Sequence, residues 1–130
     1  MYTRAELVLR FTLSAICDSY MNLTVSIDRL VMEKGRDCGL QIKTGEIIAA
    51  LEDLIVRGWA KAYYLTFKAA EEIEGMPPLD RLECHDGAWF HATEAGKKVP
   101  MWDWEFWPFE VVDDGDNPYP VRKDWTPPLN

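Results

Sequence analysis

Residues 43–65, KTGEIIAALEDLIVRGWAKAYYL, place a helix pattern and a strand pattern on either side of one glycine. Before the glycine, apolar side chains recur at steps of one, three and four, which keeps one stripe of a helix buried. Thr44 is expected to cap the start of this helix with its hydroxyl, and Glu46 suits the positive end of the helix dipole. Gly58 supplies a residue that easily adopts the left-handed conformation past a helix end. The aromatic residues that begin at Trp59 then favour a strand, so a helix–strand unit is predicted.

Two more helices are expected before this unit. Thr3 and Glu6 have the spacing of a capping box, which predicts a first helix from residue 4 to Asp18 or Tyr20. Apolar side chains lie on more than one side of this helix, as is typical of a central helix or of one that partly meets another subunit. A second, shorter helix is predicted over residues 25–35, VSIDRLVMEKG, whose final glycine ends it.

Short strands and turns are expected in the rest of the first hundred residues. Leu40 and Ile42 favour a short strand in the connector before the third helix. Residues 66–87 are polar and rich in turn residues, and KAAEEIEGM at residues 68–76 is predicted to form a brief helical turn. AWFHAT at residues 88–93 alternates as a strand does, so it is expected to pair with the strand after the third helix as an antiparallel hairpin with a long tip.

Length and composition indicate one globular domain. A chain of 130 residues with 48% apolar side chains can bury a single core without disulfides. The three cysteines are an odd and widely spaced set, which favours reduced thiols. No apolar run approaches the roughly 18 residues of a membrane span, and the N-terminal residues do not have the pattern of a secretory signal. We therefore expect a cytoplasmic protein that does not enter the membrane.

The net charge is negative and is concentrated near the C-terminus. The chain holds 14 Lys and Arg against 22 Asp and Glu, for a net charge of −8. Residues 1–99 contain 12 of the basic and 15 of the acidic side chains, so residues 100–130 carry most of the excess. Nucleic-acid-binding proteins usually have a basic surface, and the overall sign argues against that class.

Residues 100–130 differ in composition from the preceding domain, residues 1–99. They hold four of the six tryptophans and six of the eight prolines, and this many prolines preclude a long helix. Their large apolar side chains are too many to remain in water, so we expect an extended arm that packs on the same domain or on a partner subunit. Aromatic side chains flanked by charge suit a protein interface. The candidate interface residues are Trp102, Trp104, Phe106, Trp107 and Phe109.

Three helices are followed by a strand, a long tip and a second strand, and GWAKAYYL at residues 58–65 leads to WFHATEAGKK at residues 89–98. This pattern resembles that of the winged-helix superfamily, and in particular of MarR- and PadR-type bacterial regulators. Members often show an L-x-x-L helix end, a glycine, a strand, and an aromatic–Thr–Glu–x–Gly–Lys turn after the wing. The resemblance spans residues 3–98 and implies an α+β fold with a three-helix core and an antiparallel β-hairpin wing. The matching positions are Leu51, Leu54, Gly58, Trp59, Tyr64, Phe90, Thr93, Glu94, Gly96 and Lys97.

The resemblance also implies a DNA-binding surface, in which the third helix enters the major groove and the wing touches the DNA backbone. The residues in position to contact DNA are Lys43, Thr44, Arg57, Lys61, Lys97 and Lys98. Phosphate contacts need cations. The exposed face of the third helix offers three acids against two bases, and the segment between the strands offers six acids against two bases. The residues therefore favour the fold over the DNA-binding role.

Signals for catalysis, metals or nucleotides are weak. Cys84, His85 and His91 offer three ligands without the second cysteine pair of a structural zinc site. The acidic turn at residues 113–116 lacks the glutamate at the twelfth position of a calcium loop. Glycine-rich nucleotide-binding motifs are missing from the sequence. We expect no catalytic residues, no metal and no cofactor.

Two interpretations follow from these patterns. The leading one is a non-enzymatic interaction module that binds protein, including itself as a homodimer, through the arm and the first helix. The alternative is a DNA-binding regulator of the MarR or PadR type, whose dimer gathers the basic residues named above on one face.

Overall fold

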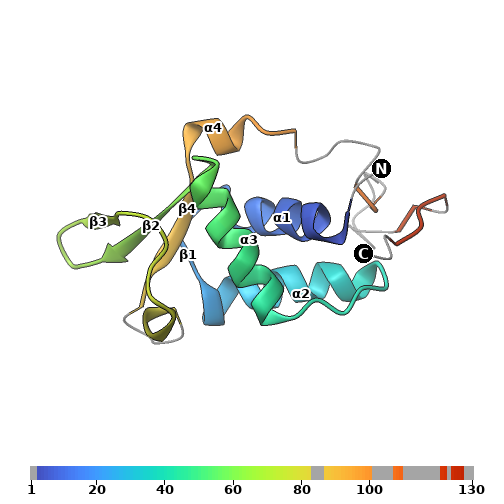
Figure 1. Ribbon diagram of the computed structural model, residues 1–130, viewed down its shortest axis with the longest axis horizontal. Coiled ribbons are helices and arrows are strands. Elements are labelled where there is room, and N and C mark those ends of the chain that lie inside the picture. Colours follow the sequence, from blue (N-terminus) through green and yellow to red (C-terminus); the bar gives the residue numbers. More distant parts are fainter. Residues whose placement is uncertain (1–2, 83–86, 101–106, 110–120, 123, 128–130) are drawn as a thin grey trace.

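The computed structural model of the chain describes residues 3–82, 87–100, 107–109, 121–122 and 124–127 (Figure 1). In this part of the chain, three main helices lie beside a four-strand antiparallel sheet, which makes the fold α+β. The helices are α1 (Arg4–Ala15), α2 (Asp28–Asp37), α3 (Thr44–Val56) and the short α4 (Glu94–Lys97); a π-helical segment η1 (Leu23–Ile27) leads into α2, and a 3-10 turn η2 (Leu79–Arg81) follows the third strand.

Helix α1 begins as predicted and ends earlier than predicted. Thr3 Oγ1 accepts a hydrogen bond from the Glu6 backbone N–H at 3.2 Å, which confirms the cap. The helix ends at Ala15 rather than at Asp18 or Tyr20. The carbonyl oxygen of Ile16 accepts from the Ala92 N–H at 3.0 Å, so the chain at this point already bonds to the sheet.

Helix α2 extends past the glycine that was predicted to end it. Gly35 is buried within the helix, where a Cβ atom would lie 2.7 Å from Ile42 Cδ1. The Leu40 N–H donates to the Gly35 carbonyl oxygen at 2.7 Å, so the connector folds back onto the helix. The strand predicted at Leu40 and Ile42 is therefore wrong: both residues are buried in irregular chain against α2, and their apolar character reflects that packing.

Helix α3 confirms the predicted helix and its glycine stop. Gly58 has a φ of 77°, in the left-handed region that glycine tolerates best. The cap differs from the prediction, because Lys43 occupies the N-cap position and Thr44 is the first helical residue. The Thr44 hydroxyl instead donates to Asp28 Oδ2 at 3.1 Å, and Glu46 Oε2 accepts from the Lys43 N–H at 2.9 Å.

The strands are β1 (Met21–Asn22), β2 (Ala60–Leu65), β3 (Ala70–Ile73) and β4 (Trp89–Ala92). Their order in the sheet is β1-β4-β2-β3, and every neighbouring pair is antiparallel. The predicted pairing of β2 with β4 is confirmed by the register of Ala62 with Phe90. The helical turn predicted at residues 68–76 is wrong, since β3 lies there and aligns Ile73 with Ala62.

The turn between β2 and β3 explains why a strand replaces the predicted helix. The Thr66 N–H donates to the Ala69 carbonyl oxygen at 2.9 Å, and Thr66 Oγ1 accepts from the Ala69 N–H at 3.2 Å. These bonds reverse the chain within four residues and direct it back along β2.

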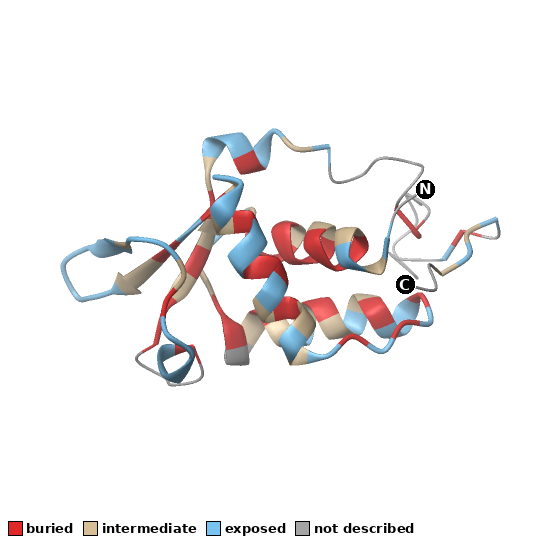
Figure 2. Ribbon diagram, viewed as in Figure 1, coloured by how far each residue is buried: buried red, intermediate tan, exposed pale blue. Residues whose placement is uncertain are grey.

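Helix α1 is the central helix of the core. Leu7, Val8, Leu9, Phe11 and Leu13 are all at most 2% exposed, although they lie on different sides of the helix. Figure 2 shows buried residues along most of α1 and exposed residues over the far end of the β2–β3 hairpin. The core thus lies between the helices and the near end of the sheet.

Candidate functional site

The solvent-facing side of α3 is acidic. Glu52 and Asp53 are exposed near its middle, while the flanking cations are Lys43 before the helix and Arg57 after it. A helix of 13 residues is roughly 20 Å long at about 1.5 Å per residue. The two cations therefore lie at opposite ends of α3, with carboxylates between them.

The guanidinium of Arg57 is held by residues of its own chain. Its Nη2 lies 2.9 Å from Glu6 Oε1, and its Nε lies 3.1 Å from Asp53 Oδ1. The same group lies 4.9 Å from the centre of the Trp59 ring, within the range of a cation–π contact. Hydrogen bonds to Glu6 and Asp53 raise the pKa of Arg57 above its usual value. Its positive charge is thus directed toward α1 and α3.

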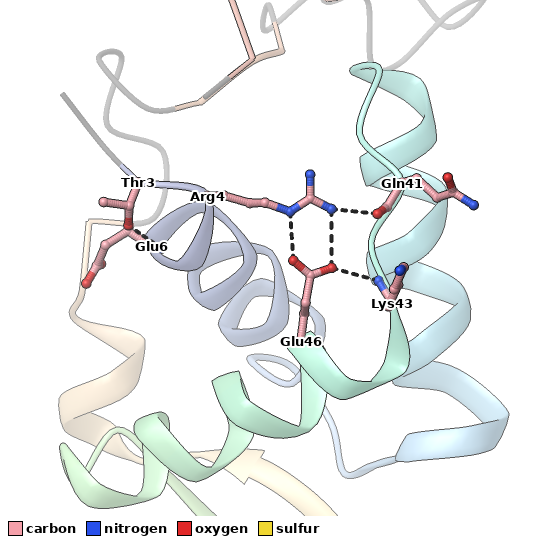
Figure 3. Close-up of polar contacts among 6 residues, drawn as sticks. All are labelled: Thr3, Arg4, Glu6, Gln41, Lys43 and Glu46. Atoms are coloured by element: carbon pink, nitrogen blue, oxygen red, sulfur yellow. Dashed lines mark hydrogen bonds and ion pairs between the residues drawn. The ribbon is translucent and has the colours of Figure 1, made fainter. Parts of the chain in front are cut away.

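A second ion pair joins the start of α1 to the start of α3 (Figure 3). Arg4 Nε donates to Glu46 Oε1 at 2.7 Å, and its Nη2 donates to Glu46 Oε2 at 3.2 Å and to the Gln41 carbonyl oxygen. The hydrogen bonds from Arg4 are the main cause of a lowered pKa of the Glu46 carboxyl, and the hydrogen bond from the Lys43 N–H lowers it as well. Glu46, which is one of the three acids expected on the exposed face of α3, therefore joins two helices.

The remaining basic candidates lie on the sheet and on α4. Lys61 Nζ in β2 is 2.7 Å from Glu72 Oε1 in β3, and this hydrogen bond raises the pKa of Lys61. Lys97 Nζ lies 3.5 Å from Glu94 Oε1 within α4, and the neighbouring Lys98 is exposed. Across the described residues, the predicted DNA contacts are spread over both ends of α3, the sheet and α4, and three of the five cations among them contact carboxylates.

The described residues of the arm pack on α1 of the same chain. Trp107 is 3% exposed and Phe109 is 1% exposed, and both rings contact Phe11, with centroid distances of 5.6 Å and 6.1 Å. The two arm rings also meet each other at 5.7 Å. The other predicted interface residues, Trp102, Trp104 and Phe106, lie outside the described residues. The contact with a partner subunit stays a prediction.

A lysine from α2 also meets the arm. Lys34 Nζ lies 5.2 Å from the centre of the Trp107 ring and donates to Ser14 Oγ at 3.0 Å. Burial lowers the pKa of Lys34. The arm is thus bound by a desolvated cation as well as by aromatic rings.

Sequence analysis did not identify Arg122, which connects two parts of the arm. The side chain is 7% exposed; its Nη1 donates to the Trp107 carbonyl oxygen at 3.1 Å, and its Nη2 lies 2.9 Å from Asp124 Oδ2. Its backbone N–H donates to the Pro108 carbonyl oxygen at 2.7 Å, next to a β-bridge between Phe109 and Val121. The available signal for this role was an arginine within a proline-rich, aromatic segment of net negative charge.

An aromatic group on the outer face of the sheet was also missed. Tyr20 stacks on the His91 ring at 4.8 Å and meets the Tyr63 ring edge-on at 5.1 Å. Partial burial, with the nearby Lys97 charge, lowers the pKa of His91. His91 is therefore packed against aromatic rings, and the other two members of its predicted metal set, Cys84 and His85, lie outside the described residues.

The described thiols lie in apolar surroundings. Burial raises the pKa of Cys38 to about 12 and also raises that of Cys17. Among the residues that the structure describes, no three His, Cys, Asp or Glu side chains are grouped so as to hold a metal ion. The acidic turn at residues 113–116 is outside this part of the chain.

Comparison of the chain with protein-family models, with curated proteins and with solved structures finds no match to any of them. In the described part of the chain, no helix has both the length and the apolar character needed to cross a membrane.

Proposed function

We propose that the chain is a winged-helix module that binds protein, including a second copy of itself, and that it is neither an enzyme nor a nucleic-acid-binding protein. The winged-helix assignment is supported by the order of the elements, with three main helices and an antiparallel hairpin that follows the third. It is also supported by the Gly58 turn that joins α3 directly to β2.

The single observation that carries the choice of partner is the pairing of Arg57. This predicted DNA contact lies at the end of α3, and its donors are directed to Glu6 and Asp53. Binding to a phosphate would require these carboxylates to give up the guanidinium and would bring them close to another anion. The same argument applies to Lys61 beside Glu72 on the sheet.

Self-association through the arm and α1 is the second part of the proposal. Trp107 and Phe109 bury their rings on Phe11, so the complementary surfaces of arm and helix are present in every copy. The same contact made between two copies produces a dimer by exchange of arms, which needs no new surface.

Fluorescence anisotropy with labelled duplex DNA of mixed sequence tests the choice of partner. We expect no sub-micromolar complex at low salt, and Arg57→Glu should leave the weak residual signal unchanged. A sub-micromolar complex that salt weakens and Arg57→Glu abolishes would overturn the proposal in favour of the MarR- or PadR-type regulator.

Light scattering coupled to size exclusion tests self-association. We expect the mass of a dimer at high protein concentration and a shift toward the monomer on dilution. A monomer at every concentration would remove the homodimer from the proposal and leave the binding of other proteins to be tested.

A further inference from the structure

Among the strands that the structure describes, β3 forms an open edge of the sheet. It is last in the strand order, and its ladder partner is β2. Figure 1 shows the β2–β3 hairpin projecting from the body of the molecule, away from the helices. Ala70, Glu71 and Glu72 in the strand are exposed, as is Glu74 after it. Such an edge can accept a further strand from another chain.

The register shows which backbone groups of β3 face outward. The bond from the Thr66 N–H to the Ala69 carbonyl oxygen makes these two residues a hydrogen-bonded pair at the turn. Antiparallel pairs alternate along a hairpin, so Ala70 opposite Leu65 is a pair without ladder bonds, and Glu72 is the next such residue. The N–H and carbonyl groups of Ala70 and Glu72 therefore point toward the open edge.

Carboxylates select the charge of an added strand. Glu71, Glu72 and Glu74 lie along the edge, and Glu72 is the one of the three with a described ion pair, to Lys61. A second copy that paired its own β3 with this edge would set carboxylates against carboxylates, which is unfavourable across strands. Glu71 and Glu72 point to opposite faces of the sheet, so a chain with neighbouring pairs of lysine or arginine places cations on both faces, beside these acids.

The tip of the hairpin adds an apolar contact. Phe67 is fully exposed in the turn, and Leu65 at the end of β2 is 41% exposed. An added strand that extends past Ala70 reaches this end of the hairpin. A β-branched or aromatic side chain in that strand can pack on the Phe67 ring.

We infer that the free edge of β3 binds an extended basic segment of another protein, which adds a strand beside Ala70–Glu74 with its cations on Glu71 and Glu74. This inference rests on the proposed protein-binding function and names a surface separate from the arm and α1. Main-chain hydrogen bonds to Ala70 and Glu72 bind the segment, and the carboxylates along the edge make binding specific for a basic segment.

The experiment is a titration of the full-length ¹⁵N-labelled protein with a synthetic peptide of about eight residues, in which pairs of lysine alternate with pairs of valine so that lysines point to both faces of the added strand. We expect saturable changes in the amide signals of residues 65–74, and about tenfold weaker binding when salt is raised to roughly 0.5 M. A second peptide carries N-methyl groups on alternate residues, which removes its donors on one edge and leaves its charge intact. Loss of binding with this peptide would show that the unmodified peptide binds by strand addition, and this test needs no substitution in the protein.

Two variants test the role of the acids. Glu71→Lys with Glu74→Lys should weaken the binding of the unmodified peptide by at least about tenfold, because two attractive charge contacts become repulsive. The matched control, Glu33→Lys with Glu52→Lys, makes the same change in net charge on exposed positions of α2 and α3 and should leave binding within about twofold. The amide spectrum of each variant reports whether its fold is intact.

The remaining outcomes overturn the inference. Signal changes centred on α3 that persist with the N-methylated peptide would show general attraction to acids, and no binding at millimolar peptide would show that the edge is closed to this chemistry. Both results would refute this inference but not the proposed function. Tight binding of duplex DNA in the anisotropy assay would refute the proposed function itself.

Discussion

The phenyl ring of Phe11 meets the indole ring of Trp107 edge-on, with centroids 5.6 Å apart and ring planes at 87°. Phe11 lies in the first helix, and Trp107 belongs to the proline-rich arm near the other end of the chain. Their contact makes the arm part of the hydrophobic core. The arm extends this core over the surface of α1. Edge-to-face pairs of this kind add to the free energy gained from burial alone.

Substitution of a buried arm residue should cost as much as substitution in the core. We expect Phe109→Ala to lower the free energy of unfolding by about 3–5 kcal/mol, because the ring is 1% exposed and leaves a cavity against Phe11. Urea unfolding followed by tryptophan fluorescence measures the change. Val121→Ala is the control: its side chain is 37% exposed, so the change should stay within about 0.5 kcal/mol. Equal effects of the two substitutions would show that the arm does not pack as described.

Removal of the whole arm should expose α1. A chain truncated after Lys98 loses the rings that cover Phe11, so we expect lower solubility, a lower melting temperature and loss of any dimer. Calorimetry and light scattering on the truncated and full-length chains measure these effects. A soluble fragment with the same stability and the same mass state would show that the arm is dispensable.

The glycine of the Thr–Glu–x–Gly–Lys turn should not tolerate a side chain. A Cβ atom on Gly96 would lie 2.0 Å from the carbonyl oxygen of Trp59, which accepts a hydrogen bond from the Thr93 N–H. Gly96→Ala must separate α4 from the start of β2, and we expect a loss of about 2 kcal/mol or more in the free energy of unfolding.

Gly45→Ala is the matched control for this substitution. Gly45 lies in the first turn of α3, and a Cβ atom there would have no neighbour within 4 Å. Alanine is a better helix former than glycine, so the control should gain about 0.4–1 kcal/mol. Thermal melts of the two variants should move in opposite directions, and a destabilised control would contradict the described packing at α3.

The pair between Arg4 and Glu46 predicts a small dependence of stability on pH. Because the hydrogen bonds from Arg4 lower the pKa of Glu46 below the ordinary 4.5, its ionised form stabilises the fold above pH 4.5. This stabilisation is lost as the pH falls through the lower pKa of the folded state. The pair is partly exposed, so solvent screening keeps its contribution below about 1 kcal/mol.

Glu46→Gln isolates this contribution. Its unfolding free energy, measured by urea titration at several pH values, should fall less steeply than that of the parent between pH 4.5 and the lower pKa of the folded state. Parallel curves for the two proteins would show that the ion pair does not form in solution.

The features that local chemistry determines could be predicted from the sequence. The Thr3 cap and the Gly58 stop depend on residues next to them in the chain, and both are present. The alternation in residues 88–93 likewise identified β4 and its pairing with β2. Such signals need no knowledge of what lies across the core.

The features that distant contacts determine could not be predicted. KAAEEIEGM has good helix formers, but the Thr66 turn and the alignment of Ile73 with Ala62 make it a strand. Leu40 and Ile42 belong to the hydrophobic core, and the Ile42 side chain lies over Gly35 of α2. The buried role of Arg122 depends on the Trp107 carbonyl group, which lies 15 positions earlier in the chain.

The contact between Phe11 and Trp107 has a consequence for synthesis of the protein. Translation makes α1 before the arm, so at about 5–20 residues per second the apolar surface of the nascent helix stays uncovered for on the order of ten seconds until the arm is made. During that interval the rings that will meet Phe11 do not yet exist. The arm therefore packs on α1 after the rest of the core has been made, and chaperones that recognise exposed apolar helices can bind before that step.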